Sequence, residues 1–352
     1  MADTAKRAAI ATLVVGGIVV VALALWQLKI VLALLFLAFI FAAAMRPTIE
    51  SLARRGVPRP AGLALHYLVL LGVIAGFLWL VLPRALDQVD RALGDLPQTR
   101  TELGQEAERS TGIKQEILTG LQRRLKDVPS GSELVDPAVH VTLTVFEIGL
   151  GIFFTLATAA YWIFERDKAE DLVCSLIPRP KRKKVRDTWE LIDAKLGAYV
   201  RGQAVLIGAV GAVLSLVFWA IGLPYWLLVG AFAGFVEIVP VVGPLAAGAL
   251  AIGVGLTQSV QIAVLAGLAV LAVRLLEDYL VIPRVLGDAV GLTPLVVLVS
   301  VTACGILFGG FAVILAIPLA AVVATLVNVI VRNQDPAEED VPAVIFSPSD
   351  SE

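Results

Sequence analysis

The stretch Glu237-Ile-Val-Pro240-Val-Val-Gly243-Pro244 interrupts a hydrophobic segment of 33 residues that runs from position 224 to position 256. One continuous helix of that length would measure about 50 Å, whereas the hydrocarbon core of a bilayer is about 30 Å thick. The segment is too long for one upright helix and too short for two full spans and a turn. Proline has no backbone N–H and glycine tolerates unusual dihedral angles, so the stretch ends a helix and frees carbonyl groups. We predict a re-entrant hairpin that turns at Pro240, Gly243 and Pro244.

A second hydrophobic segment, residues 294–331, is interrupted by Gly309-Gly310. Its 38 residues correspond to about 57 Å of helix, so two nearly full spans are compatible with its length as well as a hairpin. If both broken segments are hairpins, residues 203–256 and 258–331 form an inverted repeat. Paired, interrupted segments in matching positions are typical of substrate pathways in secondary transporters.

Between the broken segments, residues 258–282 form an unbroken apolar segment with three charged side chains near its end, Arg274, Glu277 and Asp278. Their spacings of i,i+3 and i,i+4 place them on one helix face, where they can pair with one another. The alternative to a pathway role is a paired charge cluster at the membrane interface. Glu237 has the same two interpretations: it binds a cation or carries a proton, or it holds the backbone of its own hairpin.

The composition indicates an all-α polytopic membrane protein. Of 352 residues, 58% are hydrophobic and only 16% are charged, with a mean hydropathy of +0.88. In a typical soluble domain, about a quarter of the residues are charged. We predict about 6–8 transmembrane helices, with the two interrupted hairpins among them. Two distant cysteines, Cys174 and Cys304, and two histidines offer no metal or disulfide spacing. We expect no metal, no cofactor and no enzymatic activity, because HExxH and GxSxG motifs are also missing from the sequence.

Residues 1–82 read as N-terminal transmembrane helices. Two apolar runs, 8–26 and 30–45, are parted by only three residues and predict a tight helical hairpin, which Arg46-Pro47 ends. Four arginines then follow in a short loop before the apolar run 61–82, namely Arg46, Arg54, Arg55 and Arg59. Basic short loops stay in the cytoplasm, so both chain termini are predicted to be cytoplasmic, in a plasma (inner) membrane.

The remaining segments alternate in polarity. Residues 83–137 predict an extramembrane amphipathic helical segment, and residues 138–164 a transmembrane helix with Glu147 inside it or at its interface. Residues 165–202 predict a basic cytoplasmic helical segment, because six of the eight residues in 179–186 are basic. Such a cluster is topogenic or attracts an anionic leaflet, and neither role requires nucleic acid. Residues 203–332 form the predicted transport core, and the acidic tail 333–352 is expected to be disordered.

The last third of the chain also resembles the autoinducer-2 exporter family, the PerM-type permeases. The resemblance rests on Gly202-Gln203, the break from Glu237 to Pro244, Glu277-Asp278-Tyr279, Gly287–Leu295 and the stretch from Gly309-Gly310 to Pro318-Leu319. Arg274 departs from the family pattern, where glutamine is usual. The resemblance implies a homo-oligomeric transporter that exports a small furanosyl signalling molecule, while some relatives are regarded as sodium or lithium/proton antiporters.

Three functions follow from these observations. The leading hypothesis is a secondary transporter that exports a small polar solute, similar to autoinducer-2. A sodium (lithium)/proton antiporter is the alternative, and a non-transporting oligomeric scaffold is the third, because GxxxG pairs such as Gly72/Gly76 and Gly230/Gly234 favour helix association. The expected partners are the lipid bilayer, a small-molecule or cation substrate and further copies of the chain. The predicted pathway residues are Gln203, Glu237, Pro240, Gly243, Pro244, Arg274, Glu277, Asp278, Gly309 and Gly310.

Overall fold

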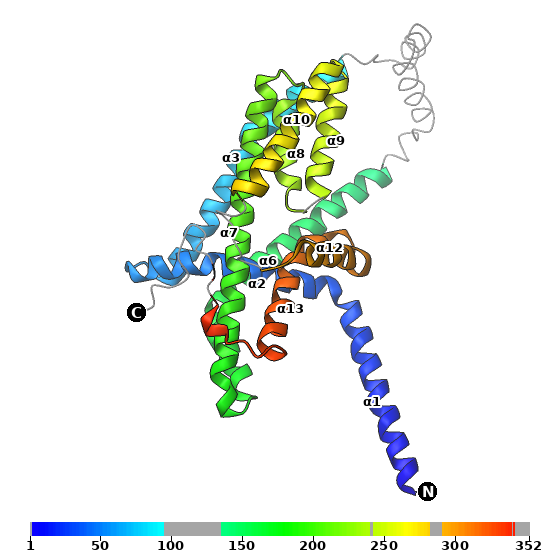
Figure 1. Ribbon diagram of the computed structural model, residues 1–352, viewed down its shortest axis with the longest axis vertical. Coiled ribbons are helices and arrows are strands. Elements are labelled where there is room, and N and C mark those ends of the chain that lie inside the picture. The colour runs from blue at the N-terminus through cyan, green and yellow to red at the C-terminus, as the bar shows by residue number, and fades with distance from the viewer. Residues whose placement is uncertain (1, 95–134, 240–241, 282–290, 340, 342–352) are drawn as a thin grey trace.

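The computed structural model describes residues 2–94, 135–239, 242–281, 291–339 and 341 (Figure 1). Within them every regular element is a helix. In chain order these are α1 (Ala2–Gln27), α2 (Lys29–Arg54), α3 (Arg59–Gly94), α6 (Val135–Ser175), the 3₁₀ turn η1 (Arg179–Lys181), α7 (Arg182–Ala220), α8 (Trp226–Val236), α9 (Val242–Leu256), α10 (Val260–Leu276), the π-turn η2 (Glu277–Val281), α12 (Pro294–Phe308), the 3₁₀ turn η3 (Gly310–Leu315), α13 (Ala316–Ile330) and the 3₁₀ turn η4 (Pro336–Glu338).

The predicted fold class is confirmed. In the described residues, six helical segments are long and apolar enough to cross a membrane. The arms of the first broken segment are shorter: α8 has 11 residues and α9 has 15, about 16 and 22 Å. Neither arm reaches across a hydrocarbon core of about 30 Å. Large apolar side chains cover the outer surface, such as Trp79 (79% exposed) and Ile306 (78% exposed), as expected where a helix faces lipid.

Helix α7 is the long helix that packs against two separate groups of helices (Figure 1). Its C-terminal half packs against α8, α9 and α10 around a core that includes Phe218 and Leu214. Its N-terminal half packs against α2 and α13. A second core, which includes Ile49 and Leu63, joins α2, α3 and α6. The 39 residues of α7, about 58 Å, therefore continue from the predicted basic segment into the predicted span without a break.

The N-terminal helices differ from the expected hairpin. Only Leu28 separates α1 from α2, and the hydrogen bonds Leu28 N–Ala24 O (3.0 Å) and Leu32 N–Leu28 O (2.9 Å) carry the helical pattern through the junction. The junction is therefore a bend, and α1 extends away from the other helices (Figure 1). The prediction of a tight hairpin was wrong because two polar residues, Gln27 and Lys29, do not interrupt helical hydrogen bonding by themselves.

Helix α2 also continues past the proline expected to end it. Pro47 lies inside the helix, which runs on to Arg54. A proline in a helix interior costs about 3 kcal/mol. Beyond it, however, Ile49 is only 1% exposed and packs in the core with Leu63. Burial of such a side chain contributes about 1.5–3 kcal/mol, and the neighbouring Ala44 carbonyl accepts a hydrogen bond from Arg201 (3.2 Å).

The second broken segment turns at Gly309, and its two arms are unequal. Helix α12 has 15 residues, about 22 Å, whereas residues 310–330 are long enough to cross a membrane. Gly309 has φ +91°, a left-handed conformation that favours glycine, and α12 packs back against η3 and α13. The segment is therefore a hairpin with one short arm rather than two full spans.

The tail is ordered at its beginning, contrary to the expectation of disorder from residue 333. Residues 336–338 form η4, which contacts α7. The buried Lys195 amine, in a side chain 5% exposed, pairs with Glu339 (2.5 Å) and donates to Thr325 Oγ1 (3.2 Å). A buried ammonium group needs such acceptors, which explains why this part of the tail folds back. Most of the predicted amphipathic segment 83–137 and the end of the tail lie outside the described residues.

Candidate functional site

The break after α8 forms a tight turn. Helix α8 ends at Val236, and turn hydrogen bonds follow from Val239 N to Val236 O (3.0 Å) and from Gly243 N to Val239 O (2.8 Å). A Cβ atom on Gly243 would lie 2.1 Å from the Val236 carbonyl oxygen, closer than any side chain permits. Glycine at this position therefore lets the first turn of α9 approach the last turn of α8. Pro240, a predicted pathway residue, lies outside the described residues.

Small residues fix the hairpin against α7. A Cβ atom on Gly234 would lie 2.7 Å from the Gly211 Cα atom, and one on Gly230 would lie 2.6 Å from the Ser215 Cα atom. The two helices thus cross with their backbones in contact, the packing that small residues at four-residue spacing allow in membranes. Gly230 and Gly234 therefore form a helix contact within one chain, and this contact fixes the position of the turn along α7.

Charged side chains gather where α10 ends. Regular α-helix gives way to the π-turn η2 at Glu277, and π-turns are frequent at functional sites. Arg274 Nη1 lies 3.2 Å from Glu277 Oε2, and Arg274 Nη2 lies 2.8 Å from Asp278 Oδ1. The two ion pairs expected from the i,i+3 and i,i+4 spacings are therefore present.

Arg274 also reaches the broken hairpin. Its Nη1 atom lies 2.9 Å from Glu237 Oε1 at the end of α8. The Glu237 side chain is 6% exposed and that of Glu277 is 4% exposed, whereas Arg274 is 28% exposed. The Gln203 side chain of α7 donates from Nε2 to the Glu237 carbonyl oxygen (3.0 Å), a helix-terminal group that has no intrahelical partner. Three separate elements thus meet at Glu237.

A small cavity lies beside this cluster. It has about 230 Å³ of space not filled by atoms, and it is lined by Glu237, Pro244, Arg274, Glu277 and apolar side chains from α7, α8, α9 and α10. That figure includes space open to solvent, and the cavity itself has room for about one water molecule. This conformation is therefore closed to a small organic solute. The apolar walls, such as Leu214 and Val270, were not among the predicted residues, because no sequence signal separates them from ordinary core residues.

The structure brings together seven of the ten predicted pathway residues around the turn. These are Gln203, Glu237, Gly243, Pro244, Arg274, Glu277 and Asp278. Gly309 and Gly310 do not join them: both are exposed, and η3 packs with α12, α13 and α2 in another part of the molecule (Figure 1). In the part of the chain that the structure describes, no group of three or more His, Cys, Asp or Glu side chains could hold a metal ion.

Fold and site together define a polytopic α-helical membrane protein with a broken hairpin in its core. Residues 16–332 match the family described as AI-2E family transporter, and the chain belongs to this family of membrane transporters. It is similar to "Putative transport protein YrrI" from Bacillus subtilis, with 25% identity over 80% of this chain and 81% of the relative. It is also similar to "Putative transport protein YueF" from Bacillus subtilis (26%; 84% and 82%). "Putative permease PerM" from Escherichia coli is 24% identical over 84% of this chain and 86% of the relative.

Proposed function

We propose that this chain is a secondary transporter that exports a small polar solute along the turn of the α8–α9 hairpin. The observation that carries the proposal is the ion pair between the buried carboxylate of Glu237, at the broken end of α8, and the partly exposed Arg274 of α10 (2.9 Å). A carboxylate at membrane depth costs several kcal/mol and is a functional hypothesis by default. Here the carboxylate of Glu237 lies where the helix is interrupted. Irregular backbone at membrane depth is tolerated only where it is buried in protein or faces water.

The ion pair acts as a gate in this proposal. Glu237 and Arg274 close the small cavity by binding each other, and Gln203 holds the turn against α7. A polar solute enters when its own hydrogen-bonding groups replace the contact between Glu237 and Arg274. Both side chains then keep a polar partner during the exchange, which avoids the cost of leaving a buried charge unpaired. The solute class follows from these groups: the guanidinium donates and the carboxylate accepts, a pair suited to a small compound with several hydroxyl groups. The family description supports a solute similar to autoinducer-2.

A sodium (lithium)/proton antiporter is the second candidate. One observation favours it: within the described residues, three carboxylates, from Glu237, Glu277 and Asp278, contact the one guanidinium of Arg274. The cluster thus has more negative than positive formal charges, and a small cation or a proton would balance the excess. We rank this function second because Arg274 occupies the centre of the cluster, where a cation would otherwise bind.

Flux in proteoliposomes tests the proposal. Purified protein is reconstituted, autoinducer-2 is loaded inside, and its release is followed under a proton gradient and under a sodium gradient, applied separately. We expect gradient-driven release that falls at least tenfold in Glu237→Gln, a change that keeps size and removes charge. Glu190→Gln, which alters an exposed carboxylate of α7, is the matched control and should keep wild-type release.

The outcomes separate the three functions. Sodium-dependent proton movement without solute release, abolished by Glu237→Gln, identifies the antiporter. No flux of either kind, with an unchanged oligomeric state in Glu237→Gln, identifies a scaffold. Wild-type release in the Glu237→Gln protein would refute the proposed gate.

We further propose a plasma-membrane location with both termini in the cytoplasm, a homo-oligomeric assembly and no enzymatic activity. The arginine-rich loop between α2 and α3 and the basic residues 179–186 support this orientation. The extended α1, with apolar side chains such as Leu13 75% exposed, supports contact with lipid or with a second copy. Accessibility of single cysteines placed at each terminus in sealed vesicles tests the orientation.

A further inference from the structure

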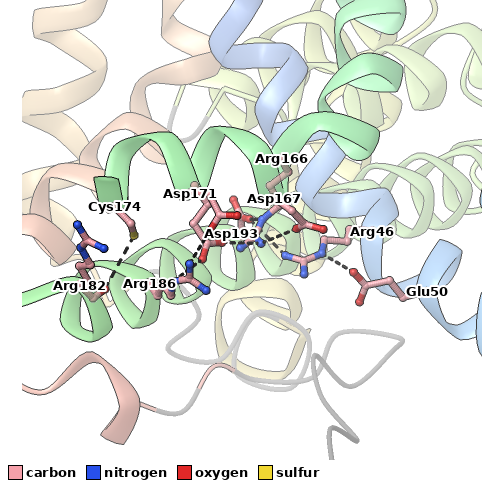
Figure 2. Close-up of polar contacts among 10 residues, drawn as sticks. Arg46, Glu50, Arg166, Asp167, Asp171, Cys174, Arg182, Arg186 and Asp193 are labelled. Carbon is pink, nitrogen blue, oxygen red and sulfur yellow. Dashed lines mark hydrogen bonds and ion pairs between the residues drawn. The ribbon is translucent and has the colours of Figure 1, made fainter. Parts of the chain in front are cut away.

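A second network of charged side chains, made of other residues than the hairpin cluster, joins α2, α6 and α7 (Figure 2). Arg166 of α6 is at its centre: Nε lies 2.6 Å from Asp193 Oδ2 on α7, and Nη1 lies 2.9 Å from Glu170 Oε2. Arg46 of α2 reaches the same Asp193 carboxylate (3.6 Å) and pairs with Glu50 (2.5 Å). The network holds the three helices together at the end of the molecule that carries the basic loops.

One nitrogen of this network has no acceptor among the residues that the structure describes. Arg166 is 5% exposed, and its Nη2 atom is buried without a hydrogen-bond partner in the described protein. In the described part of the chain, every other buried side-chain nitrogen or oxygen has a hydrogen-bond partner. Burying a charged donor without an acceptor is costly, so native structures usually supply one.

Arg166 lines a partly enclosed cavity with about 360 Å³ of space not filled by atoms. Two further arginines, Arg46 and Arg59, contribute to its wall. The carboxylates of the wall, Glu50 and Asp167, are already bound to Arg46 and Arg166, respectively. Arg59 is exposed at the start of α3 and forms no ion pair within the described residues. Two of the arginines that line this cavity, Arg59 and Arg166, therefore carry donors that no acceptor within the described residues satisfies.

We propose that this cavity, lined by Arg46, Arg59 and Arg166, binds a phosphate group. A planar guanidinium matches the oxygen spacing of phosphate and forms two parallel, charge-assisted hydrogen bonds with it. The phosphate comes either from the headgroup of an anionic lipid or from free inorganic phosphate, since both present the same oxygens. The site is independent of the transport pathway, because its residues are not those of the hairpin cluster.

Arg59→Gln tests the site without breaking the network, since Arg59 pairs with no charged side chain among the described residues. Arg55→Gln is the matched control: it removes an exposed arginine of the same short loop that does not line the cavity. The full chain is purified into phosphatidylcholine nanodiscs, and thermal unfolding is followed by tryptophan fluorescence. Two probes are titrated at constant ionic strength, which excludes simple screening: inorganic phosphate, and phosphatidylglycerol in place of phosphatidylcholine.

We expect one probe to raise the unfolding temperature of the wild type and of Arg55→Gln, with about tenfold weaker apparent affinity in Arg59→Gln. Stabilisation by phosphatidylglycerol alone identifies a lipid headgroup, and stabilisation by inorganic phosphate identifies a soluble anion. If neither probe stabilises the wild type, or if the two variants respond equally, the site is refuted.

Discussion

Replacing Arg274 with glutamine should destabilise the protein strongly, because this arginine holds two buried carboxylates at once. Its Nη1 atom lies 2.9 Å from Glu237 and 3.2 Å from Glu277, whose side chains are 6% and 4% exposed. Removing one partner of a buried ion pair costs about 3–5 kcal/mol, since the other charge stays buried. Arg274 itself is 28% exposed, and the contact with the 42% exposed Asp278 adds little. We therefore expect the lower end of that range, about 3 kcal/mol.

A double-mutant cycle isolates the contact that forms the proposed gate. Glu237→Gln removes one of the two carboxylates, so the double variant Glu237→Gln/Arg274→Gln should recover part of the loss. We expect a coupling free energy of about 1–3 kcal/mol between these two positions. The assay is reversible unfolding of the protein in mixed micelles by increasing denaturing detergent, followed by circular dichroism, with the free energy of unfolding taken from two-state transitions.

A matched exposed pair provides the control for this cycle. Lys168 and Glu165 have the same i,i+3 spacing as Arg274 and Glu277, but they lie 3.8 Å apart and are 80% and 61% exposed. Lys168→Gln should change the free energy of unfolding by less than about 0.5 kcal/mol. The reasoning is refuted if Arg274→Gln costs no more than Lys168→Gln, or if the Glu237 and Arg274 effects add within about 0.5 kcal/mol.

Two further predictions concern the turn and the tail. Gly243→Ala should destabilise the protein by about 1–3 kcal/mol in the same unfolding assay and reduce solute release, because the added Cβ atom would overlap the backbone of α8. The control is Gly253→Ala, in open space on the same helix, which should stay within about 1 kcal/mol of wild type. Equal effects of the two changes would contradict the tight turn. Glu339→Gln should cost about 1 kcal/mol and speed proteolysis of the tail, since Lys195 loses its charged acceptor. Glu338→Gln, which alters an exposed neighbour, should leave proteolysis unchanged, and unaltered proteolysis in both variants would show that the ion pair does not hold the tail.

Local sequence patterns predicted the helical elements and their interruptions well. The break in residues 224–256 was visible because two prolines and a glycine lie in the middle of a segment too long for one span. The pairing of Arg274 with Glu277 and Asp278 was visible because helical spacing alone brings them together. Where the prediction was wrong, at Leu28 and Pro47, neighbouring hydrogen bonds or core packing outweighed a local helix-breaking signal.

The tertiary structure decided which distant charges meet. Nothing in the spacing of Glu237 and Arg274 indicates an ion pair, because they belong to different helices that the α8–α9 turn and α10 bring together. The same holds for Arg46, Arg166 and Asp193, which come from three helices. The sequence thus determined that the chain is a helical membrane protein with broken segments, since hydrophobicity and helix breaking are local properties. Only packing determined that one broken segment meets the charged end of α10 through Glu237, and that the other, at Gly309, lies apart from it.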